Sequence, residues 1–228
     1  MDIKTAMQKL NIKSLNKFQE LFFSEYEKSP NSNFLLIAPT GSGKTALSEL
    51  LMLTNDKKSV YISPLRALAQ QVHDDLKNHT KSVLMTGDVY TDEPEELEFN
   101  TLITTYEKFD SVIRRGYKWL DDVNLVIVDE IHNMKDKNRG QSIESLIAYC
   151  LETGKKLILI SATIGNPEEI AKWTNAKLIT YSERTVPLFE YIYYGEKLYT
   201  RDGKIINIKR DIIDLSLIHI SEPTRQAE

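Results

Sequence analysis

A glycine-rich turn after an apolar segment contains the first residues whose types and spacing could do chemistry. The apolar run Phe34 to Ala38 leads into the turn, and a helical run beginning at Thr45 follows it. Glycines in such a turn let backbone N–H groups point inward at phosphate oxygens, and the helix N-terminus adds a partial positive charge. The candidate nucleotide-binding residues of this phosphate loop are Pro39, Thr40, Gly41, Ser42, Gly43, Lys44 and Thr45.

Two side chains of the phosphate loop suit a metal-bound nucleotide. Lys44 would place a positive charge at the β and γ phosphates, and the Thr45 hydroxyl would ligate Mg²⁺. Ala38 stands where the usual phosphate-loop pattern has its first glycine. The alternative interpretation is an ordinary glycine- and serine-rich turn that carries a surface lysine.

A second apolar run, Leu125 to Val128, ends in the acid pair Asp129 and Glu130. Asp129 would hold Mg²⁺, usually through water. Glu130 would orient and deprotonate the water that attacks the γ phosphate in line. An apolar strand ending in acids is common, but after a phosphate loop it indicates nucleotide hydrolysis, with Lys44, Asp129 and Glu130 as the catalytic candidates.

The elements that must position these residues alternate along the chain. Short β-branched runs separated by amphipathic helical segments predict an α/β, doubly wound parallel sheet, in which ligands bind at the carboxyl ends of the strands. The predicted strands are Phe34 to Ala38, Val60 to Ser63, Val83 to Thr86, Leu102 to Thr105, Leu125 to Asp129, Leu157 to Ser161 and Lys177 to Thr180.

The C-terminal part departs from this alternation. Pro187 to Tyr194 is expected to form an extended strand, and Leu198 to Ile208 is expected to form a β-hairpin because Asp202-Gly203 suits a tight turn with positive φ. The segment from Leu215 resembles the translation of a sequencing adapter more than a protein family. We therefore expect N-terminal helices at 1–30, the main domain at 31–185, a strand and hairpin at 186–214 and a non-native tail at 215–228.

Composition restricts the class of protein. With 29 basic and 33 acidic residues the net charge is −4, so any contact with nucleic acid must be local. The apolar runs are far shorter than the roughly 20 residues that span a membrane, which predicts a cytoplasmic protein. The single cysteine, Cys150, is expected to be packed in the core. Trp119 and Trp173 are expected to pack between helices and the sheet.

The order of the motifs resembles superfamily-two helicases of the DExH-box type, with Asp129 to His132 as the box. Phe18-Gln19 resembles the Q motif, in which the glutamine, here Gln19, reads adenine. Ser63 to Gln71 resembles motif Ia. Thr86-Gly87 and Thr104 to Glu107 resemble the motifs that contact the nucleic-acid backbone. Ser161 to Thr163 resembles motif III. The resemblance covers about Leu15 to Ile213, and it is nearest to the archaeal fork-repair DNA helicases of the Ski-two-like branch.

The resemblance implies a RecA-like, P-loop NTPase domain that uses ATP and Mg²⁺. Contacts with the phosphates of a single-stranded or forked nucleic acid would come from Arg66, Thr86, Gly87 and Thr105. His132, Ser161 and Thr163 would couple the nucleotide site to a second RecA-like domain, which is expected in cis and absent from this chain. Because that domain supplies an arginine finger, the chain alone is expected to be nearly inactive.

Several functions remain open from the sequence. The first is an ATP-dependent helicase or translocase, with DNA as the favoured substrate, and an RNA helicase of the same family is its close alternative. The second is a free-standing module that uses ATP to bind single strands without turnover. A P-loop kinase or transporter ATPase is disfavoured because Ser161 to Thr163 and Asp129 to His132 have no role in such proteins.

Overall fold

The computed structural model describes residues 1–87, 97–136, 139–183, 191–194, 197–200 and 202–207. The chain divides into two compact units, Met1–Thr185 and Val186–Glu228. Each unit is described by itself.

The first unit is built on a seven-stranded sheet in the order β3-β4-β2-β5-β6-β1-β7. Every neighbouring pair is parallel. The strands are β1 (Asn33–Ile37), β2 (Lys58–Ser63), β3 (Ser82–Met85), β4 (Thr101–Thr105), β5 (Val123–Val128), β6 (Lys156–Ser161) and β7 (Ala176–Thr180). The predicted doubly wound parallel sheet is confirmed, with one described strand for each predicted run.

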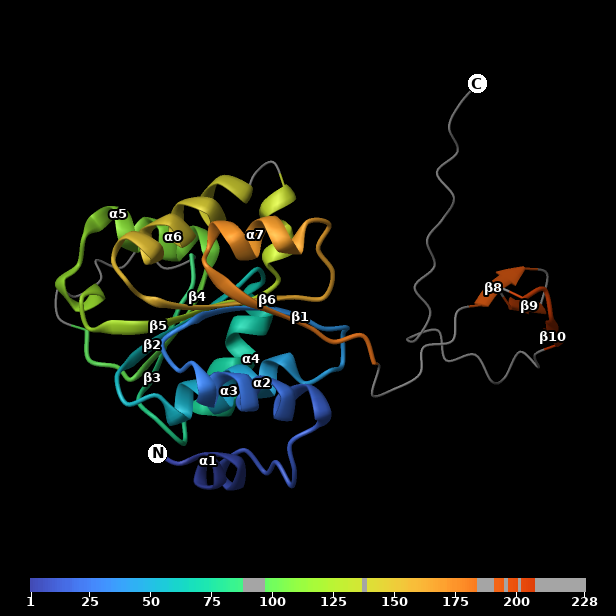
Figure 1. Ribbon diagram of the computed structural model, residues 1–228, viewed down its shortest axis with the longest axis horizontal. Helices are drawn as coiled ribbons and strands as arrows, with labels where there is room; N and C mark the ends of the chain where they lie inside the picture. Colours follow the sequence, from blue (N-terminus) through green and yellow to red (C-terminus); the bar gives the residue numbers. More distant parts are fainter. Residues whose placement is uncertain (88–96, 137–138, 184–190, 195–196, 201, 208–228) are drawn as a thin grey trace. The chain divides into compact units, whose positions relative to one another are not determined.

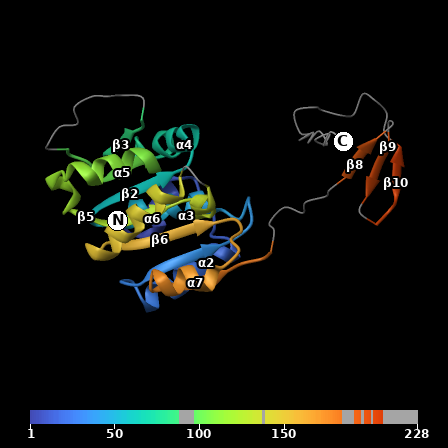
Figure 2. The same cartoon turned by 90° about the horizontal axis from the view of Figure 1, so that it is seen from above.

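Helices cover both faces of this sheet (Figures 1 and 2). One face carries α1 (Ile3–Lys9), α2 (Lys17–Lys28), α3 (Lys44–Thr54) and α4 (Arg66–Leu76), and the other carries α5 (Tyr106–Arg115), α6 (Gly140–Glu152) and α7 (Pro167–Trp173). Two 3₁₀ turns, η1 (Lys118–Leu120) and η2 (Ile131–Lys135), flank β5. Each pair of successive parallel strands is joined by a crossover connection, and the crossover helices pack on the two faces of the sheet.

Two hydrophobic clusters result from the alternation of side chains along each strand. In β1, Phe34 and Leu36 belong to the cluster under α2 and α3, while Leu35 belongs to the cluster under α5 and α6. Because successive strand side chains point to opposite faces, a continuous apolar run fills both clusters. Each such side chain, fully buried, contributes about 1.5–3 kcal/mol.

Capping fixes where α2 begins. The Asn16 side chain accepts a hydrogen bond from the Gln19 backbone N–H, and the Gln19 side chain accepts one from the Asn16 N–H, both at 3.0 Å. This reciprocal capping box satisfies two N–H groups that a helix end leaves unpaired. It also determines the position of the Gln19 side chain next to the phosphate loop.

The second unit contains three short antiparallel strands, β8 (Tyr191–Tyr194), β9 (Lys197–Thr200) and β10 (Ile205–Asn207), in the order β10-β9-β8. Gly203 has φ +80° in the connection from β9 to β10, as the predicted Asp202-Gly203 turn requires. The predicted hairpin is therefore confirmed. Residues 187–190, residue 208 and the suspected tail at 215–228 lie outside the described residues.

Single residues of the core test the sequence predictions individually. Cys150 is fully buried, and burial raises the pKa of its thiol to about 12, as expected for a packed cysteine. Trp119 is buried against Phe99 with ring centroids 5.3 Å apart. The prediction for Trp173 is wrong: it lies at the last position of α7, a helix without buried residues, and is 44% exposed.

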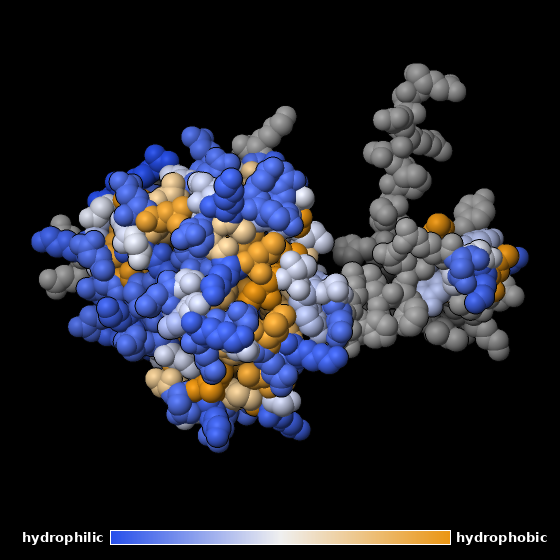
Figure 3. Space-filling model, viewed as in Figure 1, coloured by the Kyte–Doolittle hydropathy of each residue, from blue (hydrophilic) through white to orange (hydrophobic). Residues whose placement is uncertain are grey.

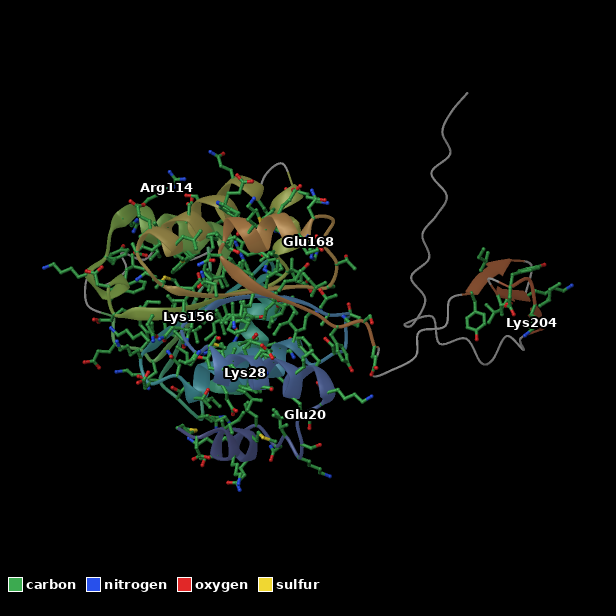
Figure 4. All side chains as sticks on the ribbon, viewed as in Figure 1. Glu20, Lys28, Arg114, Lys156, Glu168 and Lys204 are labelled. Carbon is green, nitrogen blue, oxygen red and sulfur yellow. The ribbon has the colours of Figure 1, made fainter. Side chains whose placement is uncertain are left out.

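Polar and charged side chains cover most of the visible surface of the first unit (Figure 3). Figure 4 shows Glu168 on α7 and Arg114 on α5 at one face, with Glu20 and Lys28 on α2 at the other. No helix in the described part of the chain is long and apolar enough to cross a bilayer.

A buried acid between α3 and α4 predicts a pH-dependent stability. Burial, reinforced by the nearby carboxylate of Asp75, raises the pKa of Glu49 from 4.5 to about 8. The folded protein therefore retains a proton that the unfolded chain loses, so this group destabilises the fold as pH rises from about 4.5 to about 8. We expect Glu49→Gln to remove this loss, which approaches about 1.4 kcal/mol per pH unit.

The measurement is thermal unfolding of wild type and Glu49→Gln across that pH range. The exposed Glu20→Gln change on α2 is the matched control and should show no such trend. A difference between wild type and Glu49→Gln that does not grow with pH would contradict the shifted pKa.

Candidate functional site

All the sequence-predicted site residues except Gln19 lie at or just after the carboxyl ends of parallel strands. The phosphate loop follows β1, the acid pair follows β5, and Ser161 ends β6. These three strands are neighbours in the order β5-β6-β1. Arg66 follows β2, Thr86 follows β3, and Thr105 ends β4. The sheet therefore brings the candidates to a single edge, as parallel pairing requires.

The phosphate loop turns sharply at two glycines and is closed by Lys44. Gly41 and Gly43 have φ +80° and +85°, in the left-handed region that glycine adopts readily. The Lys44 ammonium donates hydrogen bonds to the carbonyls of Ala38 at 2.7 Å and Pro39 at 3.2 Å. Burial lowers the pKa of Lys44, while the charges of Glu130 and Asp129 oppose that shift.

The start of α2 holds the phosphate loop from outside. Asn16 Nδ2 donates to the Ser42 carbonyl at 2.9 Å, and Gln19 Nε2 donates to the Gly43 carbonyl at 3.1 Å. Gln19 is only 4% exposed. The glutamine expected to read adenine thus contacts the phosphate loop, and Asn16 shares this contact.

The Asp129 carboxylate is buried and held by two hydrogen bonds. Tyr61 Oη donates to Asp129 Oδ2 at 2.6 Å, and the Glu130 N–H donates to Asp129 Oδ1 at 2.9 Å. Burial raises the pKa of Asp129, and the Tyr61 hydrogen bond partly reverses the shift. Desolvation disfavours the charged form of a carboxyl group, so a neighbouring cation would be bound strongly here.

Glu130 has a left-handed backbone, with φ 50° and ψ 47°. For a residue other than glycine this conformation costs about 1–2 kcal/mol, so the surroundings must stabilise it. The Asn133 side-chain amide donates to the Glu130 carbonyl at 2.8 Å, and Tyr106 Oη lies 3.2 Å from the same oxygen. Tyr106 also donates to the Asp129 carbonyl.

A chain of side chains runs from Glu130 to the end of β6. His132 Nδ1 lies 3.1 Å from Glu130 Oε2 and 3.3 Å from Ser161 Oγ. Ser161 Oγ in turn donates to the Thr163 carbonyl at 3.0 Å. Glu130 Oε2 is buried, and apart from this close approach of His132 no described residue donates a hydrogen bond to it. The structure therefore brings together the three residues expected to couple the nucleotide site to a partner domain.

The candidate nucleic-acid residues differ in exposure. Arg66 is exposed at the first position of α4, and its Nη2 lies 3.5 Å from where a Cβ of Gly87 would be. Gly87 is exposed and Thr86 is half-buried. Thr105 is only 5% exposed and precedes the first residue of α5. Arg66 and Gly87 form an accessible pair, whereas the Thr105 side chain is mostly enclosed.

Four supporting residues were missed by reasoning from the sequence: Asn16, Tyr61, Tyr106 and Asn133. Two had a visible signal. Asn16 stands three positions before Gln19, which is the capping-box spacing. Tyr61 places a hydroxyl between the apolar residues Val60 and Ile62, and a buried tyrosine needs a partner. Nothing in the spacing of Tyr106 or Asn133 indicates that they converge on Glu130.

The residues present fit a nucleotide with its metal ion. The Ser42 hydroxyl is buried in the phosphate loop and has no hydrogen-bond partner among the described residues. Thr45 is exposed at the start of α3, and Asp129 supplies a buried carboxylate just after β5, at the same edge of the sheet. Hydroxyl and carboxylate oxygens are the ligands that Mg²⁺ prefers in phosphate-binding sites.

The parallel sheet, the glycine turn after β1 and the acidic end of β5 define a RecA-like domain of the P-loop class. A model of the DEAD/DEAH box helicase family matches residues 16–170, which is more than half of the chain. The chain belongs to the DEAD/DEAH box helicase family.

The names of the relatives agree with the expected resemblance to archaeal DNA helicases. The chain is 41% identical over 215 residues to the candidate helicase 7 of Sulfolobus islandicus filamentous virus (isolate Iceland/Hveragerdi), covering 91% of this chain and 35% of that protein. It is 39% identical over 194 residues to the ATP-dependent DNA helicase Hel308 of Methanocaldococcus jannaschii, covering 78% of this chain and 16% of that protein. The chain thus spans about a third or less of these relatives. The expected resemblance to archaeal DNA helicases is confirmed.

A solved structure shares the fold. The Saccharomyces cerevisiae Dbp5 variant, determined with Nup159, Gle1, IP6 and ADP, superposes with a TM-score of 0.68 at 22% identity. The match covers 78% of this chain and 51% of that one. At this identity the likeness supports the RecA-like fold alone.

Removal of the phosphate-loop lysine should abolish nucleotide binding. We expect Lys44→Ala to lower affinity for ATP by about 100-fold or more, because charge-assisted hydrogen bonds to phosphate are lost. Titration with a fluorescent ATP analogue measures this. Lys58→Ala, which removes a lysine paired with Asp122 at the opposite edge of the sheet, is the control. Unchanged affinity of Lys44→Ala would refute the assignment of the loop.

Two alanine substitutions in the phosphate loop should differ in their cost. A Cβ on Gly43 would lie 2.8 Å from both Asn16 Nδ2 and Gln19 Nε2, whereas a Cβ on Gly41 meets nothing within 4 Å. Both positions carry the penalty of positive φ, so the steric clash sets the difference. We expect Gly43→Ala to lower the melting temperature by several degrees more than Gly41→Ala, since about 1 kcal/mol corresponds to 2–4 °C in a chain of this size. Equal melting temperatures would show that the α2 contacts are not close.

Proposed function

We propose that this chain is the first motor domain of an ATP-dependent DNA helicase or translocase. ATP is the cofactor, with Mg²⁺, and hydrolysis is coupled to strand separation in the complete protein. The observation that carries the proposal is the position of Lys44 after β1 and of Asp129, Glu130 and His132 after β5, at the same edge of the sheet. Family membership and the names of the Hel308 relatives support it.

In this proposal each residue at the strand edge has a distinct task. Pro39 to Ser42 and the Gly43 backbone surround the phosphates, and Lys44 leaves its loop carbonyls to neutralise them. Thr45 and Asp129 hold the metal ion, which when bound polarises the phosphoryl oxygens. Glu130 orients water and accepts its proton. Gln19 would exchange its bond to Gly43 for one to adenine.

The nucleic acid would lie over the ends of β2, β3 and β4. Arg66 supplies a guanidinium, Thr86 a hydroxyl, and Gly87 and the start of α5 after Thr105 supply backbone N–H groups, all suited to phosphates. Such contacts read the backbone and do not distinguish bases. The Hel308 names favour DNA over RNA as the substrate.

We further propose a second RecA-like domain in cis, which completes the ATP site in the whole protein. The short share of each relative that the chain covers, 16% to 35% in the two described above, is consistent with this. A partner domain's arginine finger contributes about 10³–10⁵ in rate. Residues 1–228 by themselves should therefore bind ATP weakly and turn it over very slowly.

The experiment that tests the function measures both ligands on the same chain. We expect a fluorescent ATP analogue to bind in a Mg²⁺-dependent manner and single-stranded DNA to bind in competition with RNA of equal length. Preference for RNA would support the RNA-helicase alternative. Fast ATP turnover by the chain alone would refute the need for a second domain. Tight ATP-dependent binding of single strands by this chain, with no ATP turnover by the chain or by a longer product of the same gene, would support the binding module.

Arg66 is the sharpest test of the nucleic-acid contact. We expect Arg66→Ala to weaken single-stranded DNA binding and to reduce the salt slope of the affinity by about 0.7, the value for a single phosphate contact on a single strand. The matched control is Arg114→Ala, which removes an arginine paired with Asp110 at the far end of α5 (Figure 4). Identical salt slopes for Arg66→Ala and wild type would exclude Arg66 from the interface.

A further inference from the structure

Tyr106 joins the end of β4 to the acid pair at the end of β5. It is the first residue of α5 and follows Thr105 directly. Its side chain is fully buried, and its hydroxyl donates to the Asp129 carbonyl and lies 3.2 Å from the Glu130 carbonyl. The phenol therefore reaches across β2, which lies between β4 and β5 in the sheet.

The hydroxyl is placed where the backbone of Glu130 needs support. Glu130 has the left-handed backbone that residues other than glycine rarely adopt. Its carbonyl faces Tyr106 Oη, and the Asn133 amide donates to the same oxygen. These groups fix the carbonyl, and a fixed backbone sets the direction of the Cα–Cβ bond from which the Glu130 side chain extends.

A second contact links the first turn of α5 to a different segment. Glu107, the second residue of α5, forms an ion pair at 3.1 Å with Arg139, which directly precedes α6. The first turn of α5 is thus linked to the acid pair through Tyr106 and to the start of α6 through Glu107. A shift of this turn would therefore displace the Tyr106 hydroxyl and with it the Glu130 backbone.

We propose that Tyr106 is a positioning residue for Glu130 and that its hydroxyl transmits the state of the α5 N-terminus to the nucleotide site. This inference rests on the proposed function, because Thr105 and the α5 N-terminus form part of the proposed nucleic-acid contact. Occupancy of that contact fixes the first turn of α5, and the Tyr106 hydroxyl then fixes the acid pair.

The competing explanation is that Tyr106 only fills the core. Its ring belongs to the cluster that contains Phe109 and Val112. Phenylalanine would fill that space equally well and, under this explanation, would leave the coupling between the two ligands unchanged. The hydroxyl alone therefore distinguishes positioning from packing, and Tyr106→Phe removes only that atom.

The test measures coupling between the two ligands on this chain. The affinity for a non-hydrolysable ATP analogue with Mg²⁺ is determined with and without a saturating single-stranded DNA oligonucleotide, and the ratio is the coupling factor. We expect a factor of about 5 or more in wild type, within the usual range for linked sites, and a factor close to 1 in Tyr106→Phe.

Two further variants make the result specific. Tyr117→Phe is the matched control, since Tyr117 packs against the same cluster but its hydroxyl accepts a hydrogen bond from Arg115. It should retain wild-type coupling. Asn133→Ala removes the other donor to the Glu130 carbonyl and should reduce coupling as Tyr106→Phe does. Thermal unfolding confirms that each variant is folded at the assay temperature.

The outcomes separate this inference from the proposed function. Wild-type coupling in folded Tyr106→Phe overturns the role of the hydroxyl, as does binding of both ligands to wild type without coupling. Failure of wild type to bind the nucleotide overturns the proposed function itself. Loss of coupling in Tyr117→Phe as well would show that core packing is responsible and would also overturn the inference.

Discussion

The hydrogen-bond ladder of the central strands is the constraint on which the site depends. It continues one residue beyond the strands: the Asp129 N–H donates to the Ile62 carbonyl at 2.9 Å, and the Ala38 N–H donates to the Ser161 carbonyl at 3.1 Å. These bonds hold the ends of β5 and β6 and the start of the phosphate loop at one level. Since parallel strands all have their carboxyl ends at the same edge, Lys44 is placed at the same edge as Asp129 and Glu130, which follow it by 85 and 86 positions in the sequence.

The acid pair illustrates how the protein stabilises charge inside a core. Asp129 is 7% exposed, and a buried carboxylate without partners would be strongly destabilising. Tyr61 and the Glu130 N–H satisfy it, while Lys44 provides an opposite charge nearby. These partners come from β2, from the residue after Asp129 and from the start of α3. The arrangement therefore depends on the whole sheet, and the electrostatic character of the site cannot be separated from the packing of β1, β2 and β5.

Left-handed backbone conformations occur at the proposed site as well as elsewhere in the chain, for example at Asn11 and Asn175. Glu130 adopts a left-handed conformation that its side chain disfavours, and Gly43 adopts one that only glycine could occupy next to Asn16 and Gln19. Such strain persists only where neighbours stabilise it, and it commonly marks sites that must hold one geometry. At Glu130 the stabilising groups come from α5 and η2, and at Gly43 the close neighbours come from the start of α2. Three separate segments thus hold the nucleotide site in place.

Much of this protein follows from local patterns. The apolar runs predicted all seven strands of the parallel sheet. The glycine turn with Lys44 predicted the phosphate loop. The acid pair after β5 predicted which edge of the sheet carries the site. These features are readable because each depends on a short stretch of residues. The exposure of Trp173, the burial of Thr105, the clamp of Asn16 and Gln19 on the loop and the meeting of Tyr106 with Glu130 were not readable in this way. They depend on which side chains distant segments bring together, and only tertiary packing decides that, because spacing along the chain carries no information about distances across the sheet.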